Sequence, residues 1–167
     1  MAPVAVSSDG GIGDPAAGAA TATRVTTPER RIVLAFTGDI LPHTPLIAHA
    51  ERQGAATGVA HDFTSMFAAV EPILSSVDLA VCHLETPVAP PGEVYSTAPI
   101  YGVPAGIAAG IASAGYDRCS LASNHSLDRG TAGVVTTLDA LDAVGVDHAG
   151  MARSPAEVAE PVLDVGG

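Results

Sequence analysis

Residues 32–39 of the chain read IVLAFTGD, and this stretch decides the class of fold. A short continuous apolar run that ends in a Gly-Asp turn is typical of a buried parallel strand followed by a tight connection. We expect this strand to cover residues 31–37, so that Asp39 follows its carboxyl end. The remaining elements can be ordered outward from this strand.

Apolar runs and helical periodicities alternate after the first strand. Further strands are predicted at 78–82, 117–121, 146–149 and 161–165, and helices at 62–76, 104–115, 131–144 and 154–160. Such alternation predicts an α/β fold with helices packed on a parallel sheet. A sheet that stops at its fifth strand has an unfinished edge. We therefore expect residues 29–167 to be the N-terminal part of a truncated domain.

Boundary residues and inward faces support these helices. Asp62 can cap the helix at 62–76, Pro72 is expected to kink its last turn, and Gly145 ends the helix at 131–144. The residues expected to face inward are Phe63, Phe67, Val70, Leu74, Ile107, Ile111, Val134, Leu138 and Leu141. Residues 1–28 lack any such period and are rich in small residues and breakers, so they are interpreted as a linker-like arm.

The charge balance excludes one large class of function. The 167 residues carry 18 Asp and Glu against 7 Arg and no Lys, and residues 53–117 contain no Lys or Arg. A nucleic-acid binder needs basic side chains to neutralise phosphates, so that function is excluded. An anionic substrate would need metal ions or helix N-termini. No apolar run approaches the roughly 18–20 residues of a membrane span, so no transmembrane segment is expected.

The two cysteines do not form the framework of a small disulfide-rich protein. Cys82 and Cys119 each lie in a short apolar run. The favoured interpretation is a pair of buried thiols, and a bridge between them is the less favoured alternative.

Polar residues follow three predicted strands. They form the segments Thr37-Gly38-Asp39, His83-Leu84-Glu85 and Ser123-Asn124-His125. Ligands bind at the carboxyl ends of strands in parallel α/β sheets, so these side chains should share one rim. Carboxylate, amide and imidazole groups suit divalent metals, and two metals could bind a phosphoryl oxygen and activate water.

Each of these residues could also have a purely structural role. Asp39 could cap a turn, Glu85 could be a solvated loop residue, and Asn124 could adopt a left-handed turn conformation. His125 could be a satisfied core or turn histidine. Asp128 is interpreted mainly as the cap of the helix that follows it.

Three motifs resemble one family. Residues 37–40 read TGDI, residues 84–87 read LETP, and residues 121–130 read LASNHSLDRG. These motifs resemble the capsule-synthesis CapA/PgsA family of poly-γ-glutamate biosynthesis proteins, which have a calcineurin-like metallophosphatase fold. The resemblance spans about residues 31–165 and implies a layered, metallophosphatase-like α/β sandwich.

The resemblance also implies roles for individual residues. Asp39 looks like the first metal ligand, Glu85 like the carboxylate after the second strand, and Asn124 like a ligand of a second metal. His125 looks like the catalytic histidine that contacts or protonates a leaving group. The implied cofactors are divalent metal ions, two if both sites are complete, with Mn, Fe, Zn and Mg not distinguished. His43, His83 and Asp128 are weaker candidates for metal or substrate contact.

The chain departs from the family pattern at three positions. Ser123 replaces the first Asn of Asn-Asn-His, and His83 stands where Asn often precedes Leu-Glu. Leu41 occupies the histidine position of the metallophosphatase Asp-x-His motif. The histidine motifs that complete the family's site are expected after residue 167.

Two functions follow from the resemblance. The first is a metal-dependent, phosphatase-like hydrolase that acts on an anionic polymer or a phosphoester during capsule (poly-γ-glutamate) or cell-envelope polymer biosynthesis. The alternative is a non-catalytic accessory subunit for polymer synthesis or export beside membrane-bound synthase subunits, or an inactive fragment of such a protein. An extracytoplasmic, envelope-associated location in a bacterium is expected, and the Ala-rich, lysine-free composition indicates a GC-rich genome.

Overall fold

The computed structural model describes residues 31–159, and the predicted arm at 1–28 and strand at 161–165 lie outside this range. Within it, a parallel sheet of four strands has the order β1-β2-β3-β4. The strands are β1 (Leu34–Ile40), β2 (Leu79–Leu84), β3 (Arg118–Ser120) and β4 (Asp147–Ala149). The predicted α/β class is confirmed, and each strand is connected to the next through at least one helix.

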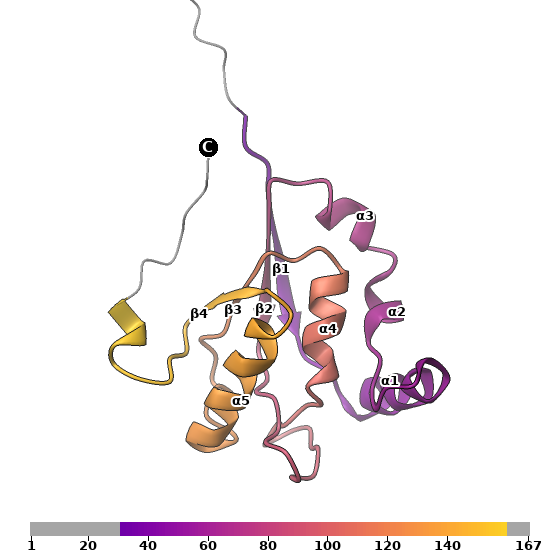
Figure 1. Cartoon of the computed structure of the whole chain (residues 1–167), viewed down its shortest axis with the longest axis vertical. Helices are drawn as coiled ribbons and strands as arrows, with labels where there is room; N and C mark the ends of the chain where they lie inside the picture. Colours follow the sequence, from indigo (N-terminus) through magenta and orange to yellow (C-terminus); the bar gives the residue numbers. More distant parts are fainter. Residues whose placement is uncertain (1–30, 160–167) are drawn as a thin grey trace, which may run out of the picture. The chain divides into compact units, whose positions relative to one another are not determined.

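The helices lie beside the sheet, with α4 and α5 in front of it in the view of Figure 1. They are α1 (Thr44–Thr57), α2 (Thr64–Phe67), α3 (Glu71–Leu74), α4 (Gly106–Ser113), α5 (Gly130–Asp142) and the 3-10 helix η1 (Glu157–Ala159). The helices predicted at 104–115 and 131–144 correspond to α4 and α5. Gly145 follows α5 with a φ of 73°, as expected for a residue that terminates a helix.

The predicted single helix at 62–76 is wrong, because the structure has α2 and α3 in its place. Pro72 lies in the first turn of α3 rather than inside a longer helix. Proline lacks an amide hydrogen, and a helix tolerates this only in its first turn. The N-cap position of α2 is Phe63, but Asp62 does bond the start of this helix, since its Oδ1 accepts a 2.9 Å hydrogen bond from the Thr64 amide.

The helix α1 was not predicted from the sequence. The buried residues of this helix are Ala50 and Gly54, which are too small to produce an apolar stripe. Gly54 lies directly against the backbone at Val59 and Ala60, where a Cβ atom would clash. Ile47 is only partly buried against the core, so α1 lacks the stripe of large buried side chains by which hydrophobic periodicity reveals a helix.

The core lies between the helices and one face of the sheet. Alternate residues of β2, Ala80, Cys82 and Leu84, are buried on this face. The helices contribute most of the side chains that were predicted to face inward: Phe63, Leu74, Ile107, Ile111, Val134, Leu138 and Leu141 are all buried. Phe67 is partly buried against this core, and Val70 is the exception, since 41% of it is exposed.

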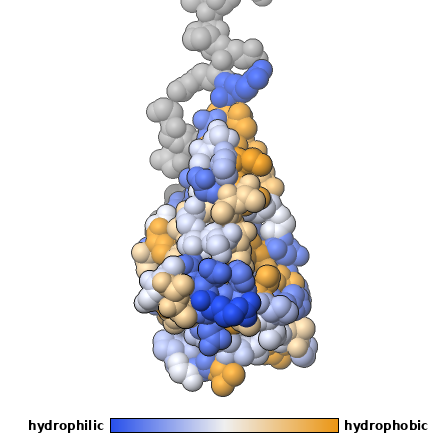
Figure 2. Space-filling view, turned by 90° about the vertical axis from the view of Figure 1, so that its right-hand side faces the viewer, coloured by the Kyte–Doolittle hydropathy of each residue, from blue (hydrophilic) through white to orange (hydrophobic). Residues whose placement is uncertain are grey.

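The opposite face of the sheet is more open. Phe36, in register with Val81 on β2, is 70% exposed, and Ile32, Val33 and Leu34 are also exposed. Figure 2 shows apolar surface running along one side of a more hydrophilic face. Within residues 31–159, no helix is both long and apolar enough to cross a membrane.

The favoured interpretation of the cysteines as thiols is wrong, because Cys82 and Cys119 form a disulfide. Both residues are buried as expected. They are register partners on the neighbouring strands β2 and β3, with their Cα atoms 4.5 Å apart. Their separation of 37 residues in the sequence contains no information about strand register, so pairing became evident only in the folded sheet.

Candidate functional site

A bulge in β1 sets the direction of Asp39. Phe36 pairs with Val81 and Asp39 pairs with His83, so β1 advances three residues while β2 advances two. The extra residue turns Asp39 onto the same face as His83. The predicted strand at 31–37 ended too early, because Asp39 lies inside β1, and the interpretation of Asp39 as a turn cap is therefore wrong.

Asp39 and His83 form the first polar pair of the site. The Oδ1 atom of Asp39 lies 4.0 Å from Nε2 of His83. The Asp39 side chain is 62% exposed and that of His83 25% exposed. Both groups are thus open to an incoming ion or ligand, and His83 was singled out in the sequence only as a weaker candidate.

Glu85 lies directly after β2 and is far more buried than Asp39, the other carboxylate predicted as a main metal ligand. Its side chain is only 14% exposed, and its Oε1 atom lies 4.0 Å from Nε2 of His125. Its Oε2 atom is buried and has no hydrogen-bond partner within the described residues. The interpretation of Glu85 as a solvated loop residue is therefore wrong.

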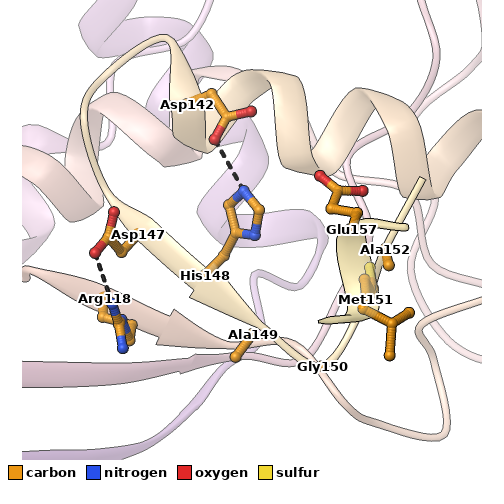
Figure 3. A pocket seen from close by; sticks show the side chains of 10 residues that line it. Arg118, Asp142, Asp147, His148, Ala149, Gly150, Met151, Ala152 and Glu157 are labelled. Atoms are coloured by element: carbon orange, nitrogen blue, oxygen red, sulfur yellow. Dashed lines mark hydrogen bonds and ion pairs between the residues drawn. The ribbon is translucent and has the colours of Figure 1, made fainter. Parts of the chain in front are cut away.

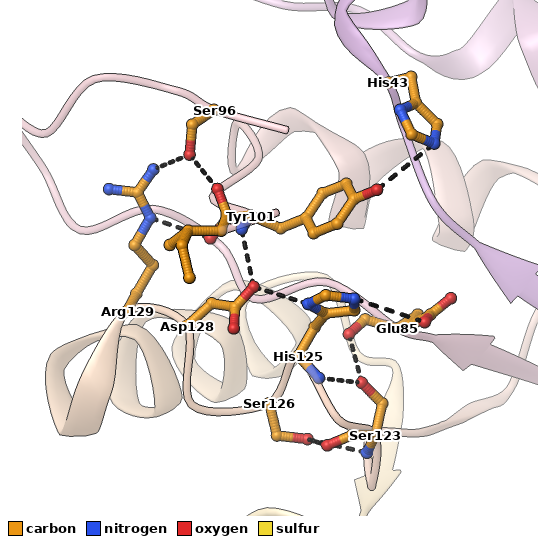
Figure 4. Close-up of polar contacts among 10 residues, drawn as sticks. His43, Glu85, Ser96, Tyr101, Ser123, His125, Ser126, Asp128 and Arg129 are labelled. Atoms are coloured by element: carbon orange, nitrogen blue, oxygen red, sulfur yellow. Dashed lines mark hydrogen bonds and ion pairs between the residues drawn. The ribbon is translucent and has the colours of Figure 1, made fainter. Parts of the chain in front are cut away.

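Two serine hydroxyls shape the turn that presents His125. Ser123 Oγ donates a 2.8 Å hydrogen bond to the Glu85 carbonyl and accepts one of 2.9 Å from the His125 amide. Ser126 Oγ is within hydrogen-bond distance of the Leu121 carbonyl and of the Ser123 amide. Ser123, a departure from the family pattern in the sequence, thus joins the β2 end to the His125 turn (Figure 4).

Asp128 orients the imidazole of His125. Its Oδ2 atom lies 2.7 Å from Nδ1 of His125 and accepts a 2.7 Å hydrogen bond from the Tyr101 amide. The main role predicted for Asp128 was wrong, because α5 has Arg129 at its N-cap and no side-chain cap. A carboxylate accepts hydrogen bonds, so the hydrogen resides on Nδ1 and Nε2 is directed toward Glu85.

Tyr101 is a site residue that the sequence analysis did not identify. Its ring packs edge-on against His125, with centroids 4.6 Å apart, and its hydroxyl lies 3.4 Å from Nε2 of His43. His43 precedes α1, so Tyr101 connects the start of that helix to His125 (Figure 4). Only the unusual length of the Pro- and Gly-rich loop at 87–103 could have drawn attention to it.

Asn124 lies apart from these contacts. It is exposed and lines a pocket of about 670 Å³ together with Ser123, Leu127 and Met151. The left-handed turn conformation considered for Asn124 is wrong, because only glycines have positive φ within the part of the chain that the structure describes. The predicted role of Asn124 as a metal ligand stays a prediction.

The donors suit a divalent metal but form pairs rather than one cluster. Across residues 31–159, no three His, Cys, Asp or Glu side chains are close enough together to hold an ion by themselves. The buried Oε2 of Glu85 nevertheless needs a positively charged or hydrogen-donating partner. Carboxylate oxygens and imidazole nitrogens are ligands of Zn, Mn and Fe ions, so the residues fit such a group in kind.

A second pocket, of about 620 Å³, lies beside β4 (Figure 3). His148 on β4 lies 2.9 Å from the Asp142 carboxylate, and Arg118 makes a 2.7 Å ion pair with Asp147. Burial raises the pKa of Asp142, but hydrogen bonds from His148 and Arg153 outweigh it, so the pKa is lowered overall. None of the predicted site residues lines this pocket.

Comparisons with known proteins bear on this arrangement. The family model described as bacterial capsule synthesis protein PGA_cap matches residues 33–167, which include all the predicted site residues. No curated protein matches the chain. The match covers most of the sequence and confirms the resemblance found in the three motifs. The chain belongs to the bacterial capsule synthesis protein family.

Proposed function

We propose that this protein is a metal-dependent hydrolase of capsule biosynthesis, with Asp39, His83 and Glu85 as metal-binding side chains and His125 as the catalytic residue. The observation that supports this most strongly is the pairing of Glu85 with His125. The Oε1 atom of Glu85 lies 4.0 Å from Nε2 of an imidazole whose other nitrogen is bonded to Asp128, while the buried Oε2 atom of Glu85 has no hydrogen-bond partner within residues 31–159. Buried carboxylates are costly unless a cation or donor compensates them, which is the role of a bound metal.

Each residue of the site has a different role in the proposed hydrolysis. Asp128 holds the hydrogen of His125 on Nδ1 and leaves Nε2 to exchange a proton with a leaving oxygen. Ser123 fixes the distance between the β2 end and His125 through its two hydrogen bonds. A bound divalent ion would supply Lewis acidity and lower the pKa of a coordinated water.

The charge of the molecule supports a metal in this role. Residues 53–117 contain no Lys or Arg, and Arg129, next to Asp128, already contacts Glu93 and backbone carbonyls. An anionic phosphoester or polymer therefore meets few uncommitted basic side chains near His125. Metal ions would provide the positive charge that such a substrate requires. The polymer we propose is poly-γ-glutamate, handled at the outer side of the cell membrane.

One observation favours the accessory function as a second candidate. Asp39 is 62% exposed and its recorded ion pair, within residues 31–159, is with His83 alone. A rim of this kind could bind a cation-bridged polymer without hydrolysing it, beside membrane-bound synthase subunits. Three results together would favour this candidate. The Glu85→Ala variant would lose metal but still retain a synthase partner in a pull-down, and the wild type would show no hydrolysis.

The test compares metal content and hydrolysis in the full-length protein. Asp39→Ala and His125→Ala should lower the metal content or the hydrolysis of a generic phosphodiester, measured by elemental analysis and product release. Asp128→Asn should lower hydrolysis by about 10–100-fold, the usual effect of losing a residue that orients a ligand or catalytic histidine. Asp147→Asn is the matched control, because Asp147 is an exposed carboxylate whose ion pair is with Arg118 rather than with a site residue. Unchanged metal content and hydrolysis in all three site variants would disprove the proposal.

A further inference from the structure

Arg129 joins the loop at 87–103 to the start of α5. Its Nε atom donates a 3.0 Å hydrogen bond to the Tyr101 carbonyl, and Nη1 forms a 2.8 Å ion pair with Glu93. Its Nη2 atom donates to the Val94 carbonyl at 2.9 Å and to Ser96 Oγ at 2.6 Å. The side chain is only 14% exposed. One guanidinium thus holds four points of the loop, in the planar fork geometry that only arginine provides.

The shape of the loop at 87–103 leaves space for the Arg129 guanidinium. Ser96 and Gly102 exchange two backbone hydrogen bonds of 3.0 Å each, which closes the loop into a narrow hairpin-like shape. Gly102 lies so close to the guanidinium of Arg129 that a Cβ atom at this position would overlap it. A side chain at residue 102 is therefore incompatible with the observed position of Arg129.

The same loop carries the contacts that constrain His125. Beside the carbonyl bonded to Arg129, Tyr101 donates its amide hydrogen to Asp128 and packs its ring against His125. Asp128 and Arg129 are neighbours in the chain. Together they bond both backbone groups of Tyr101: Asp128 accepts from its amide, and Arg129 donates to its carbonyl. Displacement of the loop would remove a donor from Asp128 and a packing partner from His125 together.

We propose that Arg129 is a positioning residue: by fixing Tyr101 it holds Asp128 and His125 in the arrangement that leaves Nε2 of His125 directed toward Glu85. Arg129 itself contacts no proposed metal ligand or reacting atom. The effect of Arg129 on hydrolysis rests on the proposed function. Its effect on the position of His125 does not, because that arrangement exists without metal or substrate.

The test is nitrogen NMR of the histidine rings in the metal-free, full-length protein at about pH 8.5, where unperturbed imidazoles are neutral. In the wild type, His125 should show a single tautomer with hydrogen on Nδ1. Arg129→Gln should shift both ring nitrogens toward averaged values, because two tautomers then exchange. Arg153→Gln is the matched control, since Arg153 likewise bonds several partners through its guanidinium, and these partners, Asp139, Asp142 and Glu157, are not the ones that Arg129 bonds.

Gly102→Ala should displace the same guanidinium by a smaller amount, because the added methyl group would overlap it. If Arg129→Gln does not fold, the same NMR measurement on Gly102→Ala tests the inference. Unchanged His125 resonances in the folded variant, or a mixed tautomer already in the wild type, would overturn the inference. Hydrolysis in Arg129→Gln should also fall by about tenfold or more. Because the NMR measurement needs neither metal nor turnover, failure of the proposed hydrolase function would leave its outcome interpretable.

Discussion

Glu85 illustrates how a functional residue can be recognised by what it lacks. Its Oε2 atom is buried and unpaired within the described residues, whereas the hydroxyls of Ser123 and Ser126 in the nearby turn are bonded. Leaving a buried polar group unsatisfied costs about 1–3 kcal/mol, and more when it is charged. A residue retained at that cost is expected to act in binding rather than in folding.

Glu85→Gln should therefore affect stability and metal binding in opposite directions. Removal of the charge should raise the free energy of unfolding of the metal-free protein by about 1 kcal/mol, because an amide is less costly to bury than a carboxylate. Metal affinity should fall. Thermal melting with a chelator and calorimetric titration with metal measure the two effects. Glu51→Gln, at an exposed position on α1, should change neither, and a destabilised metal-free Glu85→Gln protein would contradict the argument.

The positions of single residues were predictable where they depend on the chain nearby. Asp39, Glu85 and His125 do lie at or near the carboxyl ends of strands, because strand ends can be located from local apolar runs. Asp128 was misinterpreted because its partners are Tyr101 and His125, and the position of Tyr101 depends on the path of a 17-residue loop, 87–103. No local pattern specifies that path.

At the scale of elements, α5 is joined to the start of the loop through a buried hydroxyl. Thr137 Oγ1 accepts a 2.9 Å hydrogen bond from the Val88 amide and donates one of 2.7 Å to the Gly133 carbonyl. Thr137 is completely buried. This bond attaches the loop that carries Tyr101 to the helix whose first residues follow Asp128.

Thr137→Val should lower the free energy of unfolding by about 1–3 kcal/mol, because the Val88 amide would be buried without an acceptor. Thr136→Val is the matched control. Thr136 makes the same kind of bond to its own helix, at 2.8 Å to the Ala132 carbonyl, but is partly accessible and bonds no other element. Urea unfolding of both variants gives the comparison. Equal losses of stability would show that the contact with Val88 contributes nothing.

Elements were predictable to the extent that large apolar side chains define them. The helices α4 and α5 were found because Ile107, Ile111, Leu138 and Leu141 recur at helical spacing. The helix α1 was missed because its buried positions are Ala50 and Gly54. The bulge in β1 was likewise invisible, since it is defined only by the pairing with β2.

For the whole molecule, one charged network connects α5, β4 and η1. Arg153 pairs with Asp139, Asp142 and Glu157, and Asp142 also bonds His148. These groups follow from the packing of three elements and cannot be paired from the sequence. The pKa of Asp142 is lowered because bonds from His148 and Arg153 outweigh the opposing effect of burial. A carboxyl with a lowered folded-state pKa stabilises the fold above its unfolded pKa, and loses that effect as the pH falls through the folded value.

Asp142→Asn should therefore destabilise the protein near neutral pH by no more than about 1 kcal/mol, since the side chain is half exposed and solvent screens its interactions. The difference between wild type and variant should begin to shrink below about pH 4, where this carboxyl becomes protonated in the unfolded chain, and should vanish as the pH falls through its lower folded-state pKa. Urea unfolding from about pH 3 to 7 measures this difference. A difference that grows on acidification would contradict the assigned direction of the pKa change.

The amino-acid sequence by itself determined the α/β class, the parallel sheet, the membership of the capsule synthesis family and the positions of the polar residues that follow the strands. Local apolar runs, helix terminators and short motifs contain that information. Only the tertiary structure decided that Cys82 bonds Cys119, that Asp128 orients His125, and that Arg129 holds Tyr101. Each of these contacts depends on strand register or on a loop's path, which arise when distant parts of the chain pack together.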